Sequence, residues 1–444
     1  MTTTVTPNIV NVNTTITASP APNTLQQSGA IVSAGATTLA SNTSSFCGSV
    51  SQVASLLVAP YAITSLAWAS STVTATVDAA DLEGLGVGDT FATVISGAVP
   101  AGYNGTFVAT VASTTTFTYA VSANPGSETS PGTFTGPESS YILDAATTFF
   151  AQGSSVGFYL LELGVAASDV AGVAALSTYL TTYTTPQAFY AYLVPPYWDD
   201  SASTQLAALA LAYNGPTAQT YFFVTTTSAH LSAYAGNKAV FAIVPSPTQT
   251  TQEVQVASLF YNWIANNPGS SNPLAPMQFR FLYGVTPWVR GANNTTINAI
   301  LTGFGNIALT GSEGGISNAC LFKGTTMDGA QSASWFGLDW FRINVKQRLA
   351  AAIINGSNSN PPLLYDQNGI NTLEAVANQV GSSAVAFGCA QSVTVSAVDF
   401  NTYVTQNPSD YAAGIYNGLT ATMTLQNGFM SITVNLDAVQ FASA

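Results

Sequence analysis

The residues best suited to do chemistry in this 444-residue chain are one serine, a few aspartates and a single histidine. Residues 153–157 read G-x-S-x-G, the pattern that presents a nucleophilic serine in many hydrolases. The other members of a hydrolase triad follow in the usual chain order: Asp169, Asp199 or Asp200, and His230. That pattern places the serine in a sharp turn between a strand and a helix, whereas this segment leads into an apolar run at 156–163. We therefore interpret it as a Gly/Ser turn before a strand.

The other chemical motifs are weaker. Asp199 and Asp200 are adjacent and precede an expected helix start, where acidic side chains are favoured by the helix dipole. His230 has no Cys, His or carboxylate at metal-ligand spacing, so we interpret it as an ordinary loop histidine. Gly303-x-Gly305 lacks the rest of a dinucleotide fingerprint, and the sequence has no phosphate-binding loop. These patterns predict a protein that is not an enzyme and has no cofactor and no metal site.

Charged residues are unusually rare, at 6% of the chain, and the net charge is −13. The seven Lys and Arg residues all lie between Lys238 and Arg348. This distribution argues against nucleic acid and against an anionic membrane surface as partners. No apolar run is long enough to span a membrane, and we expect neither membrane insertion nor a signal peptide. A surface so poor in charge favours extensive contact with other copies of the chain.

The three cysteines, Cys47, Cys320 and Cys389, are odd in number and far apart. We expect them to be free, buried thiols, which fits synthesis in a reducing cytosol.

Residues 1–63 are expected to form an N-terminal arm and the start of the core. In this segment Val10, Val12 and Ile16 alternate with polar residues, which predicts a strand with two different faces. Two interpretations stay open at this point. The strand is either an edge strand of the protein's own sheet or an arm that pairs with a neighbouring subunit.

Residues 64–136 are expected to form an inserted, small all-β domain of the sandwich or barrel type. Short β-type runs at 72–77, 90–95, 106–111 and 116–121 are separated by Gly, Asn and Pro turn signals. Residues 86–122, with G-D-T, Y-N-G-T-F and T-T-F-T-Y, resemble a β module that recurs as an insertion in bacteriophage structural proteins.

Residues 137–444 predict an α/β core. Apolar strands are expected at 156–163, 189–194, 221–225, 239–244 and 278–285. Helices are expected around 173–180, 206–213, 256–264, 338–352 and 371–379. Strands alternating with helices indicate a largely parallel sheet, so the predicted fold class is α/β with mixed α+β parts.

The C-terminus predicts a β hairpin. Asn427-Gly428 stands between β-type runs at 422–425 and 430–436. In the second run, four apolar residues alternate with polar ones: Met430, Ile432, Val434 and Leu436. Such a two-sided strand at a chain end suits donation to a neighbour's sheet.

The C-terminal half resembles the tail sheath protein of contractile-tailed bacteriophages. The resemblance lies in four segments and their order: 279–288 (FRFLYGVTPW), 327–355 (MDGAQSASWFGLDWFRINVKQRLAAAIIN), 369–390 (GINTLEAVANQVGSSAVAFGCA) and 419–441 (LTATMTLQNGFMSITVNLDAVQF). It spans about 137–444 plus the N-terminal segment, with 64–136 as an insertion.

This resemblance implies a structural subunit of the virion, assembled in the host cytoplasm. In that family, subunits form stacked six-fold rings around a tail tube, between baseplate and tail terminator proteins. Their N- and C-terminal arms add strands to sheets of neighbouring subunits. The sheath shortens on triggering and drives the tube through the host envelope, which allows genome ejection.

One helix carries clustered basic residues. Arg342 and Lys346 are expected to share a helix face, and we expect the Arg342, Lys346 and Arg348 region to face an acidic partner such as the tail tube. The alternative is a solvated face on which Arg342 pairs with Asp339. Other functions also stay open: a tube or baseplate protein, a secreted surface-layer protein or adhesin, and a virion glycan depolymerase.

Overall fold

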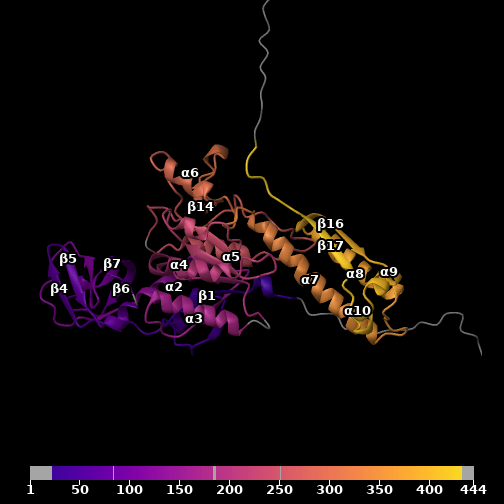
Figure 1. Ribbon diagram of the computed structural model, residues 1–444. Coiled ribbons are helices and arrows are strands. Elements are labelled where there is room, and N and C mark those ends of the chain that lie inside the picture. Colours follow the sequence, from indigo (N-terminus) through magenta and orange to yellow (C-terminus); the bar gives the residue numbers. More distant parts are fainter. Residues whose placement is uncertain (1–22, 84, 184–186, 251, 433–444) are drawn as a thin grey trace, which may run out of the picture. The chain divides into compact units, whose positions relative to one another are not determined.

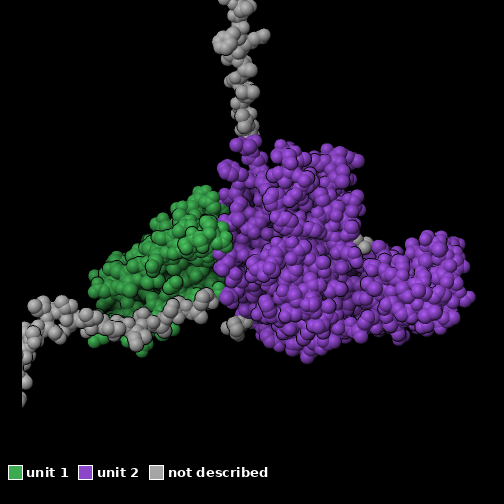
Figure 2. All heavy atoms as spheres, turned by 180° about the vertical axis from the view of Figure 1, so that it is seen from behind, with its two compact units in different colours: residues 1–23, 268–273, 336–426 green, residues 24–267, 274–335, 427–444 purple. Residues whose placement is uncertain are grey.

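The computed structural model describes residues 23–83, 85–183, 187–250 and 252–432. The chain divides into two compact units, which Figure 2 shows in green and purple. Unit 1 contains Pro268–Pro273 and Phe336–Gln426, and unit 2 contains Thr24–Asn267, Leu274–Trp335 and the residues from 427 onward. None of the helices in the described ranges is long and apolar enough to cross a membrane.

A six-stranded sheet forms the core of unit 2, in the order β13-β12-β11-β1-β10-β2. Figure 1 labels β1 of this sheet among the helices α2, α3, α4 and α5. Its strands are β1 (Gly29–Ser33), β2 (Thr43–Cys47), β10 (Phe158–Glu162), β11 (Ala191–Leu193), β12 (Tyr221–Thr225) and β13 (Val240–Ile243). Five of them run parallel, and β2 is an antiparallel edge strand paired with β10. The parallel strands are almost wholly buried, because both faces of the sheet are covered.

Two pairs of helices cover this sheet. The pairs are α2 (Pro137–Ala151) with α5 (Gln255–Ile264), and α3 (Asp169–Thr182) with α4 (Tyr197–Leu211). Phe223 of β12 contacts Phe260 of α5, with ring centroids 5.4 Å apart. The preceding residue, Phe222, is buried in a cluster with Leu206 of α4. Since neighbouring strand residues point to opposite faces, the two helix pairs lie on opposite faces, and the predicted α/β class is confirmed.

A second sheet is inserted between β2 and α2. Its seven strands are antiparallel, in the order β3-β9-β6-β7-β8-β5-β4. They are β3 (Tyr61–Ala62), β4 (Ser65–Ala69), β5 (Thr72–Thr76), β6 (Thr90–Ser96), β7 (Gly105–Ser113), β8 (Thr116–Ala120) and β9 (Thr133–Phe134). The four strands expected from the sequence are β5 to β8, and the sheet has its own buried cluster around Phe117 and Phe134. We call this sheet the β module; its independence as a folding domain stays a prediction.

The remaining elements of unit 2 are short. They are α1 (Val50–Leu56), α6 (Asn294–Thr302), the antiparallel pair β14 (Ile307–Thr310) and β15 (Ala319–Phe322), and the 3-10 helices η1 (Leu25–Gln27), η2 (Ala79–Leu82), η3 (Ala101–Tyr103), η4 (Leu231–Tyr234) and η5 (Ser312–Gly314).

The prediction of a strand at 278–285 is wrong. Phe281 forms only an isolated bridge with Cys320, and the segment is otherwise irregular. Phe279 and Gly284 both have left-handed backbone angles, with φ of 63° and 65°, which an extended strand does not allow.

Unit 1 consists of helices beside a two-stranded sheet. Its elements are α7 (Ser332–Ser357), α8 (Gln367–Ala386), β16 (Ala390–Ala397), α9 (Phe400–Gln406), α10 (Pro408–Ala412) and β17 (Leu419–Leu425). The first four residues of α7, up to Trp335, are still counted with unit 2. The long helices expected around 338–352 and 371–379 are confirmed as α7 and α8. Asp366 caps α8 by accepting a hydrogen bond from the Gly369 N–H at 2.8 Å, and α8 packs on β16.

The hairpin expected around Asn427-Gly428 does not form in the described residues. β17 pairs instead with β16, from Leu425 opposite Ala390 to Leu419 opposite Ala397. Residues 426–432 have no regular secondary structure. The Gly428 N–H donates to the side chain of Gln331 at 2.7 Å, so this turn is held by a different part of the chain.

Candidate functional site

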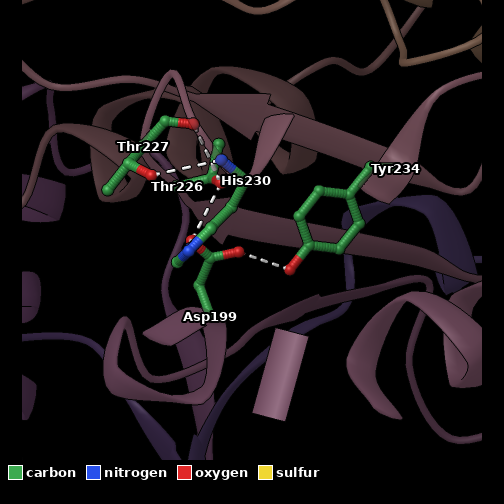
Figure 3. A network of polar contacts seen from close by, with 5 residues as sticks. All are labelled: Asp199, Thr226, Thr227, His230 and Tyr234. Carbon is green, nitrogen blue, oxygen red and sulfur yellow. Dashed lines mark hydrogen bonds and ion pairs between the residues drawn. The ribbon is translucent and has the colours of Figure 1, made fainter. Parts of the chain in front are cut away.

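The buried carboxylate of Asp199 is the centre of a polar network (Figure 3). Asp199 lies in the first turn of α4 and is 1% exposed. Its Oδ1 accepts a hydrogen bond from the Tyr234 hydroxyl at 2.6 Å, and its Oδ2 accepts one from the Thr226 hydroxyl at 2.9 Å. His230 Nδ1 lies 3.1 Å from the same Oδ2. Burial and the neighbouring Asp199 charge raise the pKa of Tyr234 far above its usual value, so this hydroxyl stays a donor.

The serine of the G-x-S-x-G segment does not join this network. Ser155 Oγ forms a hydrogen bond with the Tyr261 hydroxyl at 2.9 Å. Ser155 precedes β10, whereas Asp199 follows β11 and Thr226 follows β12. Because these strands run parallel, Ser155 lies at the amino ends of the strands, whereas Asp199 and Thr226 lie at the carboxyl ends. The interpretation as a turn before a strand agrees with the structure, because β10 follows it directly.

The same network contains a cluster with metal-ligand atoms. Asp199, Asp200 and His230 each offer one ligand atom, and these atoms lie within 4.8 Å of one another. The two oxygens of Asp199 already have three partners in Thr226, Tyr234 and His230, and this fully explains the burial of the carboxylate. We therefore interpret the network as a structural tie between the start of α4 and the end of β12.

Sequence reasoning missed the pairing of Asp199 with His230, which are 31 positions apart. The signal that could have found it is topological. Each residue follows a strand of the predicted parallel sheet, and the carboxyl ends of parallel strands meet at one edge.

The basic residues of α7 are spread around the helix. Arg342 Nη1 lies 3.7 Å from Oδ1 of Asp339, which is fully buried, so the alternative pairing is present. Lys346 and Arg348 are exposed. Arg342 and Lys346 are four positions apart and share a face, whereas Arg348 points to another side. Exposure to a partner therefore stays a prediction, carried chiefly by Lys346 and Arg348.

The two predicted arms lie mostly outside the described residues. This holds for Val10, Val12 and Ile16 of the first arm and for Val434 and Leu436 of the second. Met430 and Ile432 are described, belong to no strand, and the side chain of Ile432 is 82% exposed.

The sheet of unit 1 has two free edges. β16 and β17 pair only with each other within the described part of the chain. Two-stranded sheets are marginally stable in water, and exposed strand edges readily accept further strands. α8 packs against β16, while many residues of β17 remain exposed.

No family model matches the sequence, and neither does any curated protein. A chain of the anti-feeding prophage baseplate, solved by cryo-EM with six-fold symmetrisation, matches with a TM-score of 0.53 and 12% identity, covering 99% of this chain and 100% of that one. The sheath tail protein from Listeria innocua matches with a TM-score of 0.43 and 11% identity over 91% and 96% of the chains. The sheath tail protein from Desulfitobacterium hafniense gives 0.40 and 11% over 87% and 93%. The baseplate chain therefore shares the fold of this protein along its whole length.

Proposed function

We propose that this protein is a structural subunit of a contractile tail and forms its sheath. The observation that carries the proposal is the fold shared over 99% of the chain with a component of a six-fold symmetrised baseplate. The resemblance of residues 279–288, 327–355, 369–390 and 419–441 to tail sheath proteins points to the same kind of machine.

In this proposal the subunits form stacked hexameric rings around a tail tube. The polymer is joined to baseplate and tail terminator proteins, and its contraction drives the tube through the host envelope. The protein is then a component of the virion, assembled in the host cytoplasm, and its role is mechanical. A composition with 6% charged residues suits this role, because in such a polymer much of the surface of each subunit would be buried in contacts with other subunits.

The arms would join the subunits through the sheet of unit 1. The free edges of β16 and β17 offer main-chain donors and acceptors to an incoming strand. Phe429 and Ile432, at the start of the C-terminal arm, are 85% and 82% exposed, as expected for apolar side chains that are covered on assembly. Each main-chain hydrogen bond adds about 0.5–1.5 kcal/mol, so several per arm link subunits firmly.

A baseplate subunit is the second candidate, favoured by the source of the matching chain. The two functions differ in their assembly. A sheath subunit polymerises into long tubes of stacked rings, whereas a baseplate subunit stops at one ring or needs other proteins.

Negative-stain electron microscopy of the purified protein, with light scattering, tests the proposal. We expect six-fold rings and tubes. A monomer at tens of micromolar, with no particles, would refute the self-assembly on which both candidates depend.

Two variants test the arms. Deletion of residues 1–20 and the substitution Val434→Pro should each give a folded protein that no longer assembles, since proline removes a main-chain donor. Val434→Thr is the matched control, because it keeps the donor and the β-branched shape, and it should assemble. Normal tubes from either arm variant would show that the arms are dispensable.

A further inference from the structure

The C-terminal arm leaves from unit 2, although the strand before it belongs to unit 1. β17 ends at Leu425, and the chain is counted with unit 2 again from Asn427 onward. The following residues form no regular element, and the side chains of Phe429 and Ile432 are largely exposed. Tension on the arm therefore acts either on the pairing of β17 with β16 or on a fixed point that lies between β17 and the arm.

Asn427 and Gly428 form such a fixed point. The Gly428 N–H donates to Oε1 of Gln331 at 2.7 Å, and Nε2 of Gln331 donates to the Gly428 carbonyl at 2.9 Å. One side-chain amide thus pairs with both main-chain groups of a residue, as the opposite residue of a strand would. The Ser334 hydroxyl donates a third hydrogen bond, to Oδ1 of Asn427 at 2.7 Å. Only glycine fits at 428, since a Cβ atom there would lie 2.5 Å from Cβ of Pro276.

Gln331 is itself connected to the core sheet. It stands opposite Thr325 in an antiparallel bridge, whose flanking main-chain hydrogen bonds are 3.0 and 3.1 Å long. The buried Asn306 accepts from the Thr325 N–H at 3.2 Å and donates to the Thr325 carbonyl at 2.9 Å. Asn306 also donates to the carbonyl of Ala242 in β13, at 2.9 Å. A continuous series of contacts therefore runs from the arm to an edge strand of the six-stranded sheet, and all its members belong to unit 2.

The pair of β16 and β17 is the weaker of the two supports. β17 has β16 as its strand partner and no other within the described part of the chain, and tension that enters at Leu425 acts first on the last hydrogen bonds of this pair. β13, by contrast, is buried along its whole length, so its local opening is costly.

We propose that Gln331 is a positioning residue that anchors the C-terminal arm to the core of unit 2, so that tension on the arm is carried by the six-stranded sheet and not by the sheet of unit 1. The source of the tension rests on the proposed function, whereas the anchor is a property of the single subunit. An amide suits this position in a chain with few charges, because it binds a main-chain donor and a main-chain acceptor at once without ionising.

Hydrogen exchange in the full-length protein at neutral pH, resolved to single amides, tests the anchor without requiring assembly. We expect the Gly428 amide to be protected. Gln331→Met keeps the length of the side chain but has no amide, so it should raise the exchange rate at Gly428 by about tenfold. Gln331→Glu keeps an acceptor for the Gly428 N–H and should restore the protection.

Gln152→Met is the matched control for this experiment. Gln152 forms the same two hydrogen bonds with the main chain of Tyr283, at 2.6 and 2.9 Å, in another part of unit 2. Its replacement should leave exchange at Gly428 unchanged. Gly428→Ala tests the anchor from the side of the arm, because the added methyl group meets Pro276. It should weaken the anchor as Gln331→Met does, and it replaces that variant if circular dichroism shows that Gln331→Met is not folded.

Dissociation of assembled tubes in urea, followed by light scattering, tests whether the anchor carries tension. Tubes of Gln331→Met should come apart at a lower urea concentration than tubes of the natural protein or of Gln152→Met. A failure of Gln331→Met to form tubes, when Gln152→Met forms them, would support the same conclusion.

Three results would overturn the inference. Exchange at Gly428 that is fast in the natural protein, or unchanged in Gln331→Met and Gly428→Ala, would mean that the arm is not anchored there. Faster exchange throughout unit 2 in Gln331→Met would mean that Gln331 supports the fold in general. Tubes of equal resistance to urea would mean that the anchor carries no tension. A natural protein without tubes would refute the proposed function and the tension with it, while exchange at Gly428 would still decide whether Gln331 anchors the arm.

Discussion

The junction between the β module and the core should weaken as pH rises, because it depends on a carboxyl group that prefers to be protonated. Glu83 accepts hydrogen bonds from the Glu138 N–H at 2.6 Å, at the start of α2, and from the Tyr61 hydroxyl at 3.0 Å. Burial raises the pKa of Glu83 from 4.5 to about 7, with a smaller contribution from Asp81. The Glu138 carboxyl is also buried, and burial followed by the Glu83 charge raises its pKa.

The direction and size of the effect follow from these values. A carboxyl whose pKa is higher in the folded state stabilises the fold fully below pH 4.5, and this contribution is lost as pH rises through about 7. Each pH unit between 4.5 and about 7 corresponds to about 1.4 kcal/mol, so the loss of stability over the whole interval reaches at most about 3.5 kcal/mol. Glu83→Gln resembles the protonated carboxyl in shape and cannot ionise. Between pH 5 and pH 8, the free energy of unfolding should therefore fall by up to about 3 kcal/mol less in Glu83→Gln than in the natural protein.

Urea unfolding at pH 5 and pH 8 measures this difference, and hydrogen exchange at the Glu138 amide localises it to the junction. Asp78→Asn removes one charge from the same module at an exposed residue whose side chain caps no helix, so its pH dependence should match that of the natural protein. The reasoning fails if Glu83→Gln and Asp78→Asn lose the same stability between the two pH values.

Three further predictions concern other parts of the chain. Replacing residues 64–136 with a short Gly/Ser linker should leave assembly intact by electron microscopy, and unfolding of the remainder would show that the module belongs to the core. Charge reversal at Lys346 and Arg348, the two exposed basic residues of α7, should weaken co-sedimentation with an acidic tail tube in a salt-dependent way, whereas unchanged binding at low salt would favour a solvated helix face. Asp199→Ala should lower the free energy of unfolding by about 3 kcal/mol, because the hydroxyls of Tyr234 and Thr226 lose their acceptor. Thermal or urea unfolding measures this loss, and a value below about 1 kcal/mol would mean that the network is not structural.

The elements predicted correctly are those whose signal is local. The strands β5 to β8 combine period-two alternation with turn residues at their ends, and both signals lie within a few positions. The strands β12 and β13 are short apolar runs buried on both faces, which the sequence also displays directly. The apolar residues at helical spacing on α5 and α7 are a local signal of the same kind.

The elements that were missed depend on distant partners. β1 lies in the middle of the main sheet between β10 and β11, although the β module separates it from both in the sequence. The five residues of β1 contain no signal for its position between β10 and β11. The segment 278–285 shows the opposite error, since its alternation predicts a strand that the left-handed angles at Phe279 and Gly284 prevent. The contact of Asp199 with His230 required the strand order, which composition and spacing do not provide.

Because Lys and Arg are scarce, several buried carboxylates of unit 2 accept hydrogen bonds from neutral donors. Glu162 is 2% exposed, and its carboxylate accepts hydrogen bonds from the Ser33 hydroxyl at 2.8 Å, the Thr37 hydroxyl at 2.8 Å and the Gly164 N–H at 2.7 Å. Glu138 accepts one from the Ala34 N–H at 2.6 Å.

Neither of these acids, nor Glu83, is paired with a basic side chain in the described part of the chain; hydroxyl and main-chain donors take that role. Hydrogen bonds of this kind are screened little by salt, whereas unbalanced buried carboxyls respond to pH. In a protein built in this way we expect the junction of Glu83 with α2 to respond to pH more strongly than to ionic strength, because the pKa of Glu83 is raised to about 7.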